Sequence, residues 1–351
     1  MMKHAKKWVV GGALGAALAA APLAGMAAKE WTMATALPGV FLEDANTYAG
    51  LVETMTNGEI KVNVFAPGML GKDLKVTDIV KSGVAQVGHN WMGYDWGVDK
   101  ATVIFAGMSG GLQPEELLMY LFQAGGAEMW FDYRKEQFGV ASIPCGIFPT
   151  ELFLHSNKKI ETLEDFQGLK MRTAGAWAEI AGRLGASTVI LPGAEVYPAL
   201  ERGVIDATEW SSPSVNLDVG LNKIAKYVIT PGVHQPGAVQ ECEFNMDTWN
   251  GMTDHEREIM RLAGKVLALN TYTRYPYADI AAVQAMRDHG NEFVQLSPEF
   301  LAAANAEAAK WAEEQAAENA WFKKAYEHRL AFQNAIRAHW KSQFLYPLGA
   351  D

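Results

Sequence analysis

The stretch from residue 168 to residue 210 constrains the fold more than any other part of the chain. It reads GLKMRTAGAWAEIAGRLGASTVILPGAEVYPALERGVIDATEW. Apolar or β-branched segments at 169–173, 187–191 and 205–210 predict strands, and the segments between them predict helices. In the first helix, Trp177, Ile180, Ala181 and Leu184 recur at helical spacing, so this face should be buried. Strands that alternate with helices favour an α/β fold with largely parallel strands.

The same alternation extends over most of the chain. Further strands are predicted at residues 30–35, 60–64, 85–89, 140–143, 239–245 and 291–296, and helices at 41–55, 73–82, 114–138 and 253–289. We expect Gly125-Gly126 to break the third of these helices and residues 272–277, with Pro276, to interrupt the fourth. The chain after Ser297-Pro298 is strongly helical in pattern. A length of 351 residues favours two domains of about 150 residues each.

The first 28 residues differ from the rest. Three lysines, Lys3, Lys6 and Lys7, precede an uncharged run at residues 8–25 that consists mainly of Val, Gly, Ala and Leu. This layout is typical of a secretory signal peptide, so the mature protein is predicted to be exported and soluble in the periplasm. A membrane anchor is the alternative, but the run is rich in Ala and Gly and only weakly apolar.

Charge and cysteine content narrow the class of protein. The net charge of −10 disfavours nucleic-acid binding, which needs a basic surface. An oxidising compartment would allow Cys145 and Cys242 to form a disulfide, although the sequence does not show whether their Cα atoms come within reach.

Arg172 is the strongest candidate for a ligand-binding residue. It ends an apolar strand and precedes a glycine-containing loop into a helix, and open α/β sheets bind ligands at the carboxyl ends of their strands. Its planar guanidinium matches a carboxylate. The aromatic segment HNWMGYDWG at 89–97 reads either as a loop over the core or as a pocket wall with Trp91 and Tyr94.

Motifs for catalysis are missing from the sequence. It contains no GxxxxGK[ST] loop, no GxGxxG between a strand and a helix, no GxSxG elbow and no HExxH. His234, in PGVHQPG, could line a cleft but lacks a nucleophile partner in the sequence. These observations disfavour an enzyme.

Several segments together resemble one family. TLEDFQGLKMRTAG, LPGAEVYPALERGVIDATEW, KIAKYVITPGVHQPG, NGEIKVNVFAPGMLGKD and the helical tail are similar to the solute-binding proteins of TRAP transporters. The ATEW segment points to the subgroup that binds 2-oxo and 2-hydroxy monocarboxylates with the help of a metal ion.

This resemblance implies two interleaved α/β domains of the periplasmic-binding-protein type, joined by hinge strands and a long helix. The first domain would comprise residues 29–145 and about 242–275, and the second residues 146–241 and about 276–300. Residues 301–351 would form a helical C-terminal region.

The resemblance also implies a set of site residues. Arg172 would bind the ligand carboxylate, and Glu209, the Trp210 carbonyl and Glu241 would hold the metal. The position of a metal-binding Gln falls on Glu151, which departs from the family pattern. The expected walls of the pocket are aromatic: Trp177, Trp210, Trp91 and Tyr94.

Three carboxylates and one guanidinium would give this site a net charge of about −2, which is costly to bury. Two explanations stay open at this point. A hard cation such as Ca²⁺, or Na⁺, could bridge protein and ligand, or the ligand could be a zwitterion that carries its own positive charge.

The predicted function is capture of a small organic acid, such as pyruvate or lactate, and its delivery to TRAP membrane subunits, with no cofactor for catalysis. Alternatives are another anion or zwitterion (dicarboxylate, sulfonate or amino acid), an exported enzyme with Glu151 or Glu241 as general base, and a sensor-associated binding protein. A homodimer through the C-terminal helices is a further hypothesis. It rests on their large apolar residues Trp311, Trp321, Phe322, Phe332 and Trp340.

Overall fold

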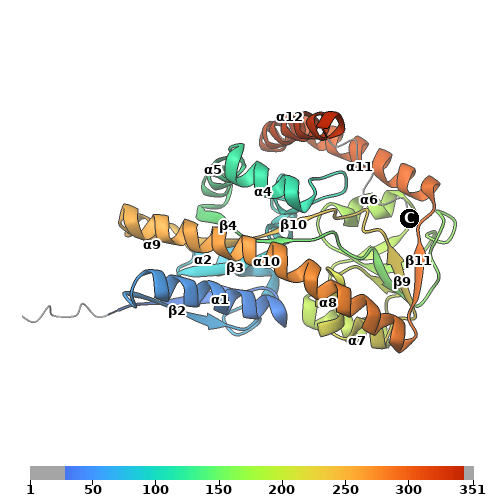
Figure 1. Cartoon of the computed structure of the whole chain (residues 1–351), viewed down its shortest axis with the longest axis horizontal. Coiled ribbons are helices and arrows are strands. Elements are labelled where there is room, and N and C mark those ends of the chain that lie inside the picture. Colours follow the sequence, from blue (N-terminus) through green and yellow to red (C-terminus); the bar gives the residue numbers. More distant parts are fainter. Residues whose placement is uncertain (1–27, 344–351) are drawn as a thin grey trace, which may run out of the picture.

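The computed structural model describes residues 28–343, in which the chain forms two β-sheets flanked by helices (Figure 1). The α/β class predicted from the alternation of segments is therefore confirmed. The predicted signal peptide, residues 1–28, lies outside the described residues except for its last position. Among residues 28–343, none of the helices combines the length and apolarity needed to span a bilayer.

The first sheet has the strand order β2-β1-β3-β10-β4. Its strands are β1 (Lys29–Thr35), β2 (Ile60–Phe65), β3 (Val87–Asn90), β4 (Val140–Phe148) and β10 (Ala238–Asn245). β1 pairs in parallel with β2 and β3, whereas β10 is antiparallel to β3 and β4. The antiparallel pairing arises because the chain leaves this sheet along β4 and returns along β10.

The second sheet has the order β11-β9-β5-β8-β6-β7. Its strands are β5 (Leu154–Ser156), β6 (Lys170–Arg172), β7 (Ser187–Val189), β8 (Ala207–Thr208), β9 (Tyr227–Thr230) and β11 (Glu292–Gln295). The stretch 168–210 forms β6, α6 (Trp177–Arg183), β7, α7 (Gly193–Glu201) and β8, as predicted, with β6 parallel to β7 and β8. β5 is antiparallel to β8 and β9 because it enters from the first sheet.

Helices cover both sheets. The remaining ones are α1 (Val40–Met55), α2 (Val76–Lys81), α3 (Thr102–Ala106), α4 (Pro114–Gln123), α5 (Gly126–Phe138), α8 (Pro213–Asp218), α9 (Met246–Asn250), α10 (Asp254–His289), α11 (Pro298–Glu318) and α12 (Ala320–Gln343), with short 3₁₀ turns η1 (Asp73–Lys75), η2 (Met92–Asp95) and η3 (Leu221–Lys223). The expected break at Gly125-Gly126 separates α4 from α5, with Gly125 at a positive φ of 81°.

α10 connects the two sheets. It begins with a capping box, in which the Thr253 hydroxyl and the Glu256 carboxylate each accept from the other's backbone N–H. It packs against β4 on one side and α8 on the other (Figure 1). The predicted interruption at 272–277 is wrong, since the helix runs unbroken through Pro276. Burial of Thr271, Tyr275 and Ala282 along one face holds it together there.

The C-terminal helices pack back over both parts of the molecule. α11 lies against α6, and α12 lies against α3, α4 and α5 (Figure 1). Trp311 and Phe322 are fully buried within this chain, and the Trp321 ring packs edge-on against Tyr133. Much of the apolar surface noted in the sequence is therefore used inside one molecule.

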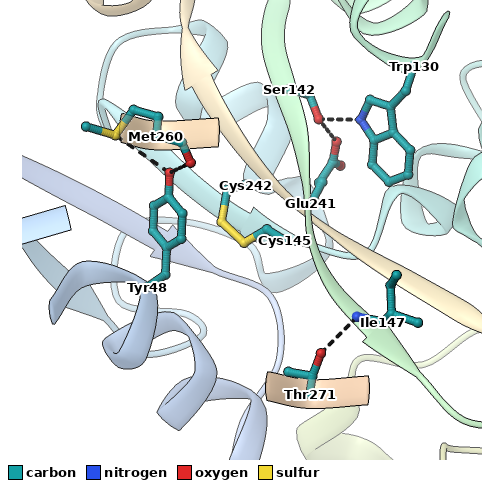
Figure 2. The surroundings of a disulfide bond; sticks show 9 residues. All are labelled: Tyr48, Trp130, Ser142, Cys145, Ile147, Glu241, Cys242, Met260 and Thr271. Atoms are coloured by element: carbon teal, nitrogen blue, oxygen red, sulfur yellow. Dashed lines mark hydrogen bonds between the residues drawn. A yellow bond between two sulfur atoms is a disulfide. The ribbon is translucent and has the colours of Figure 1, made fainter. Parts of the chain in front are cut away.

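Cys145 and Cys242 form a disulfide between β4 and β10, with their Cα atoms 5.5 Å apart (Figure 2). The pairing register of these two strands shifts between Gln240 and Glu241, so Cys145 has no partner in the ladder. The disulfide thus spans a β-bulge in the strands that link the two sheets.

Candidate ligand-binding site

The candidate binding residues meet at one edge of the second sheet. β6 and β8 are parallel neighbours, so Arg172 at the end of β6 and Glu209 just after β8 lie side by side. β5 runs the opposite way, which brings the residues before it, including Glu151, to the same edge. The loop after β9 adds His234 and Gln235 there. The site therefore follows from strand direction, as in other open α/β sheets.

Arg172 is 2% exposed and held on two sides. Its Nη1 donates to Glu209 Oε1 at 3.0 Å, while Nε and Nη2 donate to the Leu191 carbonyl at 3.3 and 3.2 Å. Its Cζ lies 5.3 Å from the centre of the Trp210 ring. These contacts fix the plane of the guanidinium and leave part of its fork directed at the cavity, where a ligand carboxylate would bind.

Glu151 is positioned by two residues of the loop after β9. His234 Nε2 lies 2.9 Å from Glu151 Oε2, and Gln235 Nε2 donates to Glu151 Oε1 at 3.2 Å. A Cβ on Gly232 would meet the Glu151 carbonyl oxygen at 2.0 Å, so only glycine lets the loop approach this closely. The Glu151 carboxylate is thus fixed in position before any ligand binds.

Burial changes the acid–base behaviour of these groups. It raises the pKa of Glu151 to about 8, although the charge of Arg172 acts against this shift. It also raises the pKa of Glu209, with Arg172 again opposing, and it lowers the pKa of His234 to about 4. His234 is therefore neutral near pH 7, and the pocket does not balance a charge on Glu151 by itself.

Glu151, Glu209 and His234 form a candidate cation site. One ligand atom from each residue lies within 4.8 Å of the others, and all three side chains are buried. Two carboxylates and an imidazole are donors that a divalent cation accepts, and the carboxylates also suit Na⁺ or Ca²⁺. The donor set thus fits the bridging cation that the sequence resemblance implies.

A cavity of about 50 Å³ lies between these residues and the first sheet. Trp91, Tyr94 and Gln240 line it from the first sheet, and Arg172 and Trp210 from the second. Trp91 and Tyr94 pack edge to face with their ring centres 5.2 Å apart. Since a water molecule needs about 10–15 Å³ of such space, the cavity suits a ligand of only a few non-hydrogen atoms.

Two predicted site residues lie elsewhere. Trp177 is buried behind His234, with ring centres 6.1 Å apart, and does not line the cavity. The prediction that Glu241 joins the metal ligands is wrong, because its Oε1 accepts from Arg134 and its Oε2 from Ser142 inside the first sheet. Its neighbour Gln240 faces the cavity instead.

The sequence reasoning missed the partners of Glu151. The sequence indicates only that His234 could line a cleft, and it points to no role for Gln235. A signal existed in YVIT, an apolar segment before PGVHQPG. Read as a strand, YVIT would have placed His234 and Gln235 at the edge that carries Arg172.

A cavity enclosed between two α/β sheets, with a buried arginine and a buried group of carboxylates, defines a solute-binding protein of the two-domain type. The chain belongs to the family described as bacterial extracellular solute-binding protein, family 7, whose model matches residues 39–319.

Relatives and solved structures agree with this assignment. The monocarboxylate 2-oxoacid-binding periplasmic protein of Nostoc sp. is 33% identical over 90% of this chain and 87% of its own length. Two TRAP periplasmic solute-binding proteins, each 27% identical with a TM-score of 0.85, align over 90% of this chain and 97% of theirs. The one from Pseudoalteromonas atlantica holds sodium and pyruvate, and the one from Colwellia psychrerythraea holds calcium and pyruvate. This chain is a solute-binding protein of the TRAP type.

Proposed function

We propose that this protein captures a 2-oxo or 2-hydroxy monocarboxylate, such as pyruvate or lactate, in the periplasm and delivers it to TRAP membrane subunits. The observation that carries the proposal is the small cavity with Arg172 on one side and the Glu151–Glu209–His234 group beside it. The ligands of the two solved relatives support the same chemistry.

In this proposal, the two ends of the ligand are recognised by opposite charges. Arg172 would bind the carboxylate with its fork, already oriented by the Leu191 carbonyl. Glu151, Glu209 and the Trp210 carbonyl would hold a Ca²⁺ or Na⁺ ion, and this ion would bind the 2-oxo or 2-hydroxyl oxygen. His234 is close enough to join the ion or to orient Glu151. Trp91, Tyr94 and Trp210 would exclude water.

No bond of the ligand is made or broken in this mechanism. Binding would draw the two sheets together around the ligand, and release would follow at the membrane subunits. An exported enzyme with Glu151 as general base is the alternative of another class. Recovery of chemically unchanged pyruvate from the purified complex by mass spectrometry would support binding, and accumulation of a product would overturn it.

A zwitterionic ligand is the second candidate for the site, because the carboxylates of Glu151 and Glu209 would also accept an ammonium group. A dicarboxylate or sulfonate would use Arg172 alone. The two main candidates differ in one measurable property. A bridged 2-oxo acid needs the cation, whereas an amino acid does not.

The experiment is a thermal-shift panel of pyruvate, lactate, dicarboxylates, sulfonates and amino acids. Each ligand is measured in sodium-free buffer under three separate conditions: with EDTA alone, with added Ca²⁺ and no EDTA, and with added Na⁺. We expect pyruvate or lactate to stabilise the protein only with a cation. At 100 times Kd the gain should be about 2.7 kcal/mol. If an amino acid stabilises the protein in EDTA, a zwitterion replaces the 2-oxo acid as the proposed ligand. If none of the acids stabilises the protein, the proposal is refuted.

The periplasmic location rests on the signal peptide predicted at residues 1–28. Expression of the full chain in a Gram-negative host should release a mature protein that begins near residue 28 or 29 into the periplasmic fraction. Uncleaved protein in the membrane fraction would instead favour an anchor.

A homodimer stays a separate proposal. Trp311 and Phe322 of the C-terminal helices are buried within the chain, whereas exposed apolar side chains follow one face of α10: Leu262, Val266, Leu269, Tyr277 and Ile280. Leu262 and Ile280 lie equally far from Thr271 along the helix, so two copies of α10 could pair antiparallel about a two-fold axis. Light scattering over a range of concentrations tests this. A monomer throughout would refute it, and Leu269→Glu should dissociate a dimer that uses α10.

A further inference from the structure

A buried group of charges lies in the first sheet, outside the ligand cavity. Arg134 on α5 is inaccessible to solvent and donates to Asp95, Glu241 and Glu243 at 2.9, 2.9 and 2.8 Å. The hydroxyl of Thr77 accepts from Arg134 at 2.8 Å and donates to Asp95 at 2.6 Å. One guanidinium thus joins residues from α2, η2 and β10.

These charges are next in sequence to the residues of the cavity wall. Asp95 follows Tyr94, and Glu241 follows Gln240. Asn90, whose Nδ2 lies 3.4 Å from Glu241 Oε1, precedes Trp91. The three cavity-lining residues from η2, β10 and the end of β3 are therefore each tied through one peptide bond to the same buried group.

The geometry of β10 fixes the position of Gln240 relative to the buried charges. Neighbouring residues of a strand point to opposite faces. Figure 2 shows Glu241 directed toward Ser142 and Trp130, while Cys242 reaches Cys145. Ser142 Oγ donates to Glu241 Oε2 at 2.6 Å and accepts from Trp130 Nε1 at 2.7 Å. β10 is thus held on both faces immediately after Gln240.

A hydrophobic core would stabilise this region at least as well as buried charges do, because ions lose their hydration on burial. Directional contacts of a guanidinium fix the positions of their partners more closely than apolar packing does. The ladder shift between Gln240 and Glu241 also needs such fixing, since a one-residue slip would turn Gln240 away from the cavity.

We propose that Arg134 and Glu241 are positioning residues for ligand binding, which set the places of Tyr94, Trp91 and Gln240 without touching the ligand. The inference rests on the proposed function. Glu241 would therefore act on ligand binding indirectly, by holding the residues that line the cavity in place.

The test compares variants of similar structural severity. Glu241→Ala removes the partner of Arg134 and Ser142. Glu241→Gln keeps the size of the side chain and the oxygen that accepts from Arg134, while its NH₂ group can donate to the Ser142 hydroxyl. Glu116→Ala is the matched control. Its carboxylate is also buried and pairs with Arg337, but, unlike Glu241, it has no sequence neighbour that lines the cavity. The dissociation constant for pyruvate with Ca²⁺ is measured by calorimetry well below each melting temperature.

We expect Glu241→Ala to weaken pyruvate binding at least tenfold, and Glu241→Gln and Glu116→Ala to stay within about threefold of wild type. A Glu241→Ala protein that binds like wild type would overturn the inference, as would an equal loss in Glu116→Ala. If Glu241→Ala does not fold, Ser142→Ala takes its place with the same expected weakening.

Crystal structures of the variants test the inference without any ligand. Tyr94 and Gln240 should be displaced in Glu241→Ala and unchanged in Glu116→Ala. If wild type binds no acid, the proposed function fails. An undisplaced wall in Glu241→Ala would refute the positioning role itself.

Discussion

At the scale of single residues, Arg172 combines burial with incomplete pairing. Glu209 takes one of its nitrogens, and the Leu191 carbonyl takes two more, but a carbonyl carries no charge to neutralise. In the proposed function, a ligand carboxylate would therefore meet a guanidinium that is already oriented and still electrostatically attractive.

Replacing Arg172 by alanine should weaken pyruvate binding by about 2–5 kcal/mol, because the ligand carboxylate and Glu209 would both lose their buried partner. Calorimetry with Ca²⁺ present measures this loss. Arg172→Lys should restore little, since an ammonium lacks the planar fork. The matched control is Arg183→Ala, whose ion pairs with Glu307 and Glu314 lie at the surface. Equal affinity of wild type and Arg172→Ala would contradict this account.

Glu151→Gln tests whether the negative charge of Glu151 is needed to bind the cation, because it changes the charge of the side chain but hardly its shape. The amide keeps an oxygen where the carboxylate had one, but it removes a negative charge that attracts a divalent ion. We expect the Ca²⁺ concentration needed for half-maximal pyruvate binding to rise at least tenfold, or about 1.4 kcal/mol. Exposed Glu195→Gln is the control and should leave it unchanged. An unaltered Ca²⁺ requirement in Glu151→Gln would exclude Glu151 as a ligand of the ion.

Single residues also mark the limit of sequence reasoning. Arg172, Glu209 and Trp210 were predictable because they follow the strands of one parallel unit, whose edge is fixed by the fold. Glu241 was not, because the side to which a strand residue points depends on register. The register is set by a bulge beside Gln240, and no pattern in the sequence predicts this bulge.

At the scale of elements, the predicted bounds differ from the observed ones in a strand that carries the chain between the two sheets. β4 was predicted to end at Ile143, before Pro144, but it extends to Phe148. Proline is tolerated there because the ladder is irregular at that point. Long helices with apolar periodicity were predicted well, whereas β9 and the short helices α3, α8 and α9 carry too few residues for a clear period.

The disulfide between β4 and β10 should stabilise the protein by about 2–5 kcal/mol, because its 97-residue separation restricts the unfolded chain strongly. Urea unfolding of wild type with and without reductant measures this difference. Cys145→Ala/Cys242→Ala should match the reduced wild type and show no response to reductant. Equal stability of the oxidised and reduced proteins would refute the prediction.

At the scale of the whole molecule, each sheet contains one buried histidine. His89 on β3 and His155 on β5 are fully buried, and neither ring nitrogen of either residue has a hydrogen-bond partner among residues 28–343. Burial lowers the pKa of His89 to about 4 and of His155 to about 3. Burial in the two sheets therefore disfavours the protonated imidazole of both histidines, a group that titrates near pH 6.5 in the unfolded chain.

The sign of the resulting pH dependence follows from linkage. A histidine whose pKa is depressed on folding contributes stability above its unfolded pKa, and this contribution is lost as the pH falls from about 6.5 toward the folded value. The loss is about 1.4 kcal/mol per pH unit for each histidine. Buried acids act in the opposite direction. Burial raises the pKa of Glu241 to about 7, so its unfavourable ionisation is relieved on acidification.

A difference measurement separates these opposing effects. The unfolding free energies of wild type and His155→Leu are compared by urea titration at pH 7, 5.5 and 4.5, without ligand. The acids are common to both proteins, so the stability of His155→Leu relative to wild type should rise by about 1.4 kcal/mol per unit as the pH falls below 6.5. His255→Leu replaces an exposed histidine of α10 and is the surface control for exchanging a histidine for leucine. A pH-independent difference for His155→Leu would mean that its imidazole accepts a proton in the folded protein.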